Sequence, residues 1–166
     1  MNLSMLSNYL HVLAMSVWVG GMFYIMLVEV PVLRSNLGAL DFSKNMTLLG
    51  KRFQKVGWIL LLLLLITGLS NIMLEDSIAD MMKNENYSYS IMVKMILFML
   101  MVINTAIHTF YLGPKMSSFA EKTSAEGNDD MNVEYAKLKK RSMISSGFSL
   151  LLSLVIIYYG LIASSV

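Results

Sequence analysis

Residues 9–23 read YLHVLAMSVWVGGMF, an apolar run that carries a histidine, a tryptophan and two adjacent glycines. The run lies inside a longer apolar segment, about residues 5–30. A helix needs about 20 apolar residues to cross the hydrocarbon core of a bilayer, so this segment is long enough to span it. A helix that only crosses lipid needs no imidazole, so the run indicates a membrane helix with an additional role.

The composition also favours a membrane protein. Hydrophobic residues make up 56% of the 166 residues, and the mean hydropathy is +0.61. Soluble domains have about 45–50% apolar residues. Three further apolar segments qualify as spans, at about residues 56–74, 90–112 and 143–163. We therefore predict one all-α domain over residues 1–166, an integral membrane four-helix up-down bundle.

The basic residues predict the orientation of this bundle. Of the 13 lysines and arginines, eleven lie in the connections between the first and second spans and between the third and fourth. The positive-inside rule places these connections in the cytoplasm, so we expect both termini on the outer, periplasmic side of a bacterial inner (plasma) membrane. A net charge of only +2 argues against a nucleic-acid partner, and the absence of cysteine excludes disulfides and thiolate metal sites.

The ionisable side chains inside the predicted spans are His11, Lys94 and His108. At a rise of about 1.5 Å per residue, His11 and Lys94 belong to one layer near the outer surface. His108 lies close to the inner surface, about 18 Å from His11 in depth. We therefore predict that the two histidines do not bind one iron within one subunit. Pro31 is predicted to end the first helix.

Each of these features also has a purely structural interpretation. A histidine can hydrogen-bond a neighbouring helix, and Lys94 can extend to the outer headgroups. Trp18 can fill space, and Gly20 and Gly21 can allow close helix contact. The 16 methionines can serve as apolar bulk or bind Cu(I), and Met15 shares a helix face with His11. A stripe of serines in the fourth span can serve close packing against a helix or a flat cofactor.

Three segments together resemble the CopD-type (copper resistance) membrane family. They are HVLAMSVWVGGMFYIMLVEVPVLR (11–34), KRFQKVGWILLLLLLITGL (51–69) and VKMILFMLMVINTAIHTFYLGPK (93–115). The related HemJ branch is similar in the same places. Its members act on protoporphyrinogen, bind haem b and use an early histidine and a third-helix lysine, which correspond to His11 and Lys94. The chain lacks the branch's later Pro-Arg, Tyr-His and Asn-Glu-Val-Pro motifs.

The resemblance implies a haem b protein with a redox or electron-transfer role, for which a quinone or another redox carrier is the expected partner. The cofactor-binding residues it implies are His11, His108, Lys94, Trp18, Gly20, Gly21 and Tyr24. Copper handling, with His11, His108 and Met15 as metal ligands, is the alternative. A HemJ-like protoporphyrinogen oxidase is the third reading, so oxidoreductase activity stays open and no catalytic residue is assigned. A homodimer is expected, because its symmetry can bring two equivalent histidines around one cofactor.

Overall fold

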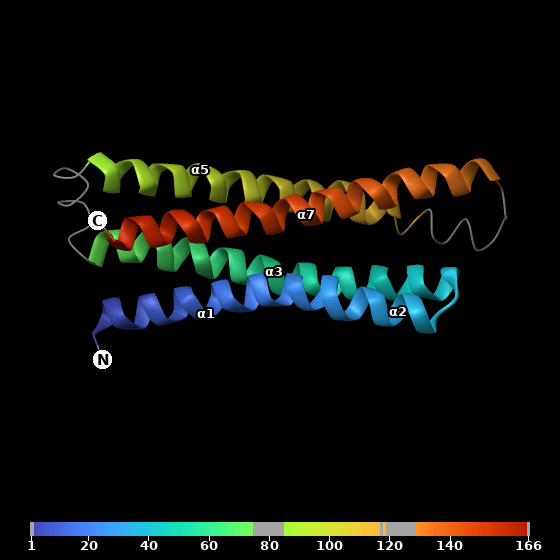
Figure 1. Ribbon diagram of the computed structural model, residues 1–166, viewed down its shortest axis with the longest axis horizontal. Helices are drawn as coiled ribbons and strands as arrows, with labels where there is room; N and C mark the ends of the chain where they lie inside the picture. The colour runs from blue at the N-terminus through green and yellow to red at the C-terminus, as the bar shows by residue number, and fades with distance from the viewer. Residues whose placement is uncertain (1, 75–84, 117, 119–128, 166) are drawn as a thin grey trace.

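The computed structural model describes residues 2–74, 85–116, 118 and 129–165, and these residues form long helices (Figure 1). The first span consists of α1 (Leu3–Tyr24), the π-helical turn η1 (Ile25–Glu29) and α2 (Val30–Asn36). The second span is α3 (Ala39–Leu74). The third consists of α5 (Glu85–Ile107) and the π-helical turn η2 (His108–Leu112), and the fourth is α7 (Asp129–Ser165). The described residues contain no strand, so the predicted all-α fold is confirmed.

The four helices are long and apolar enough to cross a membrane. These candidate spans are Leu3–Asn36, Asp41–Met73, Glu85–Met116 and Val133–Ala163, so the chain is a multi-pass membrane protein. Each helix extends beyond the apolar segment that predicted it. The largest difference is at α3, which begins at Ala39 rather than near residue 56. The polar first half of α3 continues the helix, and this satisfies the backbone hydrogen bonds of these residues.

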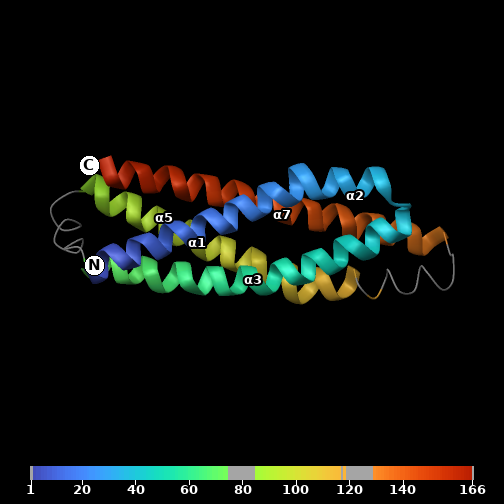
Figure 2. The same cartoon turned by 90° about the horizontal axis from the view of Figure 1, so that it is seen from below.

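The bundle is built from two antiparallel hairpins. Helix α1 packs along α3, and α5 packs along α7, whereas close backbone contacts between the hairpins are few. Figures 1 and 2 show the two hairpins side by side, with both termini at the same end of the bundle. The up-down topology therefore follows the prediction. We call the boundary between the α1–α3 hairpin and the α5–α7 hairpin the seam.

Side chains from all four helices meet at the middle of the seam. Trp18 is 4% exposed and Met101 is 2% exposed. The full cluster of buried residues is Ala14, Trp18, Leu60, Leu61, Leu64, Met101 and Leu152. Other apolar side chains, such as Ile59 and Leu62, point out of the bundle, as expected for helices that face lipid.

Both prolines of the chain follow a π-helical turn, which corrects the prediction that Pro31 ends the first helix. The helix continues through Pro31 to Asn36. In η1 the Val30 N–H bonds the Ile25 carbonyl, five residues back. In η2 the Gly113 N–H likewise donates to the backbone carbonyl of His108, and Pro114 follows directly. The wider turn moves the preceding carbonyls away from the proline ring, which removes the clash that breaks an ordinary helix.

Candidate functional site

His11 lies on α1 and faces α3. Its Nδ1 is 2.8 Å from the Thr67 hydroxyl, and that hydroxyl lies 2.7 Å from the Leu63 carbonyl. A hydroxyl has one proton, and donating it to the carbonyl leaves Nδ1–H of His11 to donate to Thr67. This network assigns the lone pair to Nε2. Within the described part of the chain, Nε2 has no hydrogen-bond partner, so it is the nitrogen available to a ligand.

Lys94 lies on α5 at the level predicted for it. Its ammonium is close enough to act electrostatically on the His11 imidazole, although the two residues come from different hairpins. The side chain is half-buried and makes no ion pair or hydrogen bond with any residue that the structure describes. An unpaired ammonium inside a membrane span is costly, so Lys94 is suited to hold an anionic group.

The two residues occupy equivalent positions in the two hairpins. His11 packs over Gly68 of α3, since a β-carbon added there would lie 3.5 Å from its Cε1. Lys94 packs over Gly160 of α7, where the corresponding distance to Nζ is 3.8 Å. In each hairpin one polar side chain lies against a glycine of the returning helix, at a distance at which an added β-carbon would make an ordinary van der Waals contact. The seam therefore has a polar layer toward the end of the bundle that holds the termini. It is formed by His11 from one hairpin and Lys94 from the other.

His108 lies far from this layer and is fully engaged with other helices. Its Nδ1 is 3.0 Å from Gln54 Nε2 on α3, and its Nε2 is 2.8 Å from the Ser142 hydroxyl on α7. Thr67 and Gln54, the α3 partners of the two histidines, are separated by about 20 Å at a rise of about 1.5 Å per residue. Metal binding at His108 requires that one of its two hydrogen bonds be given up.

Replacing His108 with alanine is expected to lower the free energy of unfolding by about 1–2 kcal/mol, because Gln54 loses its partner across the seam and Ser142 loses its partner within the α5–α7 hairpin. Unfolding of the purified protein in mixed micelles with sodium dodecyl sulfate measures this loss. The control is Ser146→Ala, since that exposed hydroxyl bonds only the Ser142 carbonyl of its own helix. Equal stability of the two variants contradicts the interhelical role of His108.

Trp18 is packed against side chains on both hairpins. Its Nε1–H donates to Ser153 of α7 over 3.0 Å, and its ring stacks on Phe53 of α3 with centroids 6.0 Å apart. A β-carbon on Gly57 would lie 2.8 Å from Trp18, and one on Gly21 would lie 2.7 Å from Phe53. The space beside these two glycines is therefore filled by aromatic side chains rather than open for a flat cofactor.

The other predicted site residues lie outside the polar layer. Gly20 has no side chain near it, and Tyr24 is 55% exposed at the end of α1. Met15 is half-buried against the core cluster, and the buried Met101 sulfur lies 3.2 Å from the Ser153 hydroxyl. The described residues contain no group of three histidine or carboxylate side chains placed to hold a metal ion.

No role was predicted for Thr67 or Gln54, and Ser153 was expected only as one of the small residues of the serine stripe in the fourth span. Each of the three binds a residue that was predicted to be functional. Only Thr67 had a signal of its own, since it is a polar residue at the end of the apolar run 56–66, and a polar group in lipid must find a partner on another helix or on its own backbone. Gln54 is next to Lys55, so the sequence around it is not apolar.

Comparison with known proteins places the chain in a family but gives no function. No curated protein and no solved structure matches it. A family model described as a domain of unknown function, DUF4149, matches residues 13–124. The matched region contains Trp18, Lys94 and His108 and begins just after His11. Because the match covers more than half of the chain, the protein belongs to the DUF4149 family.

Proposed function

We propose that this protein binds haem b in a bacterial inner membrane and has a redox or electron-transfer role, with His11 as the iron ligand. The observation that carries the proposal is the hydrogen bond from His11 Nδ1–H to Thr67, which leaves Nε2 available at membrane depth. A histidine that binds a metal usually donates its second ring proton to a fixed acceptor, which orients the ring and increases its basicity. Thr67 supplies such an acceptor.

Lys94 fits the same cofactor from the other hairpin. Haem b has two propionates, and an ammonium without an ion pair among the described residues is a suitable partner for one of them. Lys94 is also a candidate sixth ligand. Haem supplies one-electron chemistry when bound, and the ligand's hydrogen bond tunes its potential. The filled space around Trp18 and Phe53 favours a cofactor at the polar layer rather than beside Gly21.

The role of a second subunit follows from the number of histidines. His108 is held by Gln54 and Ser142, so one chain offers one available imidazole among its described residues. A symmetric homodimer brings a second His11 at the same depth, which provides bis-histidine ligation if Lys94 binds a propionate. The distribution of basic residues supports a periplasmic position for both termini, and with them for the polar layer.

The test is the absorption spectrum of detergent-purified protein produced with added haem precursor, together with metal analysis. The wild type is expected to show a Soret band that His11→Ala loses and His108→Ala retains. Thr67→Val is expected to retain the band but raise the reduction potential, because the imidazole loses the hydrogen bond that increases its basicity.

Two results overturn this proposal. One is a wild-type preparation without pigment, and the other is a His11→Ala variant with the full Soret band. Stoichiometric copper in a colourless preparation supports copper handling instead, with His11 and Met15 as the first residues to replace.

A further inference from the structure

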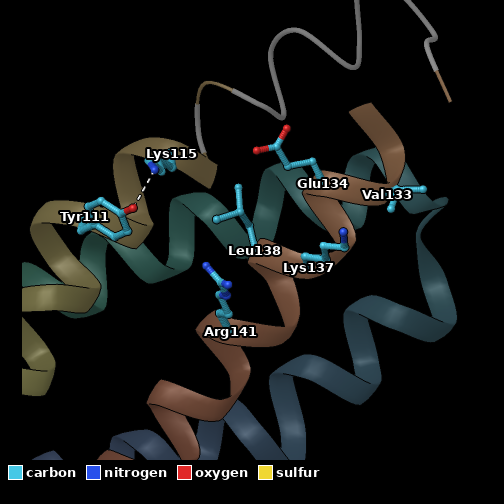
Figure 3. A pocket seen from close by; sticks show the side chains of 7 residues that line it. All are labelled: Tyr111, Lys115, Val133, Glu134, Lys137, Leu138 and Arg141. Atoms are coloured by element: carbon cyan, nitrogen blue, oxygen red, sulfur yellow. Dashed lines mark hydrogen bonds between the residues drawn. The ribbon is translucent and has the colours of Figure 1, made fainter. Parts of the chain in front are cut away.

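A cleft lies at the other end of the bundle, between η2 with the residues that follow it and the first turns of α7. Its volume is about 440 Å³, and three cationic side chains line it, Lys115, Lys137 and Arg141. Figure 3 shows Arg141 extending from α7 toward the pair formed by Tyr111 and Lys115. The cleft is at the end of two membrane spans, so it lies at the level of lipid headgroups.

The positive charge of this cleft is not neutralised by the residues that the structure describes. Glu134 is the one carboxylate among the described residues that line it, and no lysine or arginine forms an ion pair with another described residue. Lys115 donates a hydrogen bond to the Tyr111 hydroxyl over 2.8 Å, which is a neutral acceptor. Three cations around one small space repel one another, so an anion entering it is attracted by all three.

The surroundings of the cleft are apolar, which indicates the kind of anion. Leu138 at its wall is 7% exposed, while Val133 is 56% exposed. Next to the cleft along the two helices lie Phe110, Met143 and Ile144, which are 73%, 66% and 62% exposed. A ligand with a phosphate for the cations and acyl chains for these side chains fits better than a free phosphate ion.

We propose that this cleft binds the phosphate of an anionic phospholipid in the leaflet away from the termini, with Lys137 and Arg141 as its main contacts. The proposal stands apart from the haem site, because no residue is shared and the two lie at opposite ends of the bundle. Basic pockets between membrane helices bind anionic headgroups by the same combination of charge and apolar contact.

The experiment measures phospholipid binding to the detergent-purified full chain by native mass spectrometry, with phosphatidylglycerol as the probe and phosphatidylcholine for comparison. We expect the wild type to prefer phosphatidylglycerol. The double variant K137Q/R141Q is expected to bind it about 30-fold more weakly, since each cation near an anionic lipid contributes about a fivefold effect.

The matched control is K51Q/R52Q, which removes the same charge from exposed positions of α3 outside the cleft. This control is expected to bind phosphatidylglycerol as the wild type does, with unchanged helical circular dichroism in both double variants. Equal weakening in both double variants overturns the proposal, because it indicates a general charge effect. Saturable binding of inorganic phosphate without any preference for phosphatidylglycerol overturns the assignment to a lipid.

Discussion

Replacing Trp18 with alanine is expected to lower the free energy of unfolding by about 3 kcal/mol, the largest stability loss from a single side-chain deletion in this bundle. Removal of a buried aromatic side chain costs about 3–5 kcal/mol. The lower end applies here, because moving the ring from lipid into the bundle gains no hydrophobic free energy. The loss comes from the packing against Phe53 and Gly57 and from the Ser153 hydroxyl that is left without its donor.

Unfolding in mixed micelles, followed by near-ultraviolet circular dichroism, measures this change. The matched control is Tyr9→Ala, which removes an aromatic side chain that is 63% exposed and faces out of the bundle. That variant is expected to unfold as the wild type does. Trp18→Phe separates the two contributions, since it keeps most of the ring and removes the N–H donor. A Trp18→Ala protein as stable as Tyr9→Ala is incompatible with a packed seam.

The second large effect is expected from Gly57→Leu, which should lower the free energy of unfolding by about 3 kcal/mol, the upper end for overpacking. A β-carbon at this position lies 2.8 Å from the Trp18 ring. The ring cannot move away easily, because Phe53 stacks on it and Ser153 holds its N–H. The added side chain therefore forces α1 away from α3 and disturbs the contact of Trp18 with α7.

The control for this prediction is Gly50→Leu in the same helix, where nothing lies within 4 Å of an added β-carbon. Leucine is the better helix former by about 1 kcal/mol, so the control is expected to match or slightly exceed the wild type. Thermal unfolding midpoints of the two variants in one detergent compare them directly. If Gly57→Leu and Gly50→Leu unfold at the same temperature, the close contact between Gly57 and Trp18 is contradicted.

The sequence predicts the helices well because a membrane span is a local property of the chain. Twenty apolar residues can satisfy their backbone in lipid only as a helix. Counting residues along two parallel helices was also sufficient to place His11 and Lys94 in one layer. The helix ends were predicted less well, since the start of α3 at Ala39 lies in polar sequence that carries no apolar signal.

The partners of the site residues could not be predicted in the same way. Trp18 beside two glycines is compatible with a flat cofactor or with a packed core, and the difference depends on Phe53 and Gly57 in another helix. His108 is similar, because Gln54 and Ser142 belong to two different spans. The roles that the CopD and HemJ resemblance implies for His11 and Lys94 stay predictions, which the absorption spectrum tests.

The seam has a consequence for how the protein is made. Each hairpin has its own close backbone contacts, whereas the hairpins are joined mainly by side chains such as Trp18 with Ser153 and Trp58 with Thr109. Each hairpin can therefore enter the bilayer during synthesis as a separate insertion unit, and docking of the two units comes last. His11 and Lys94 belong to different hairpins, so the polar layer is complete only once the two hairpins have docked.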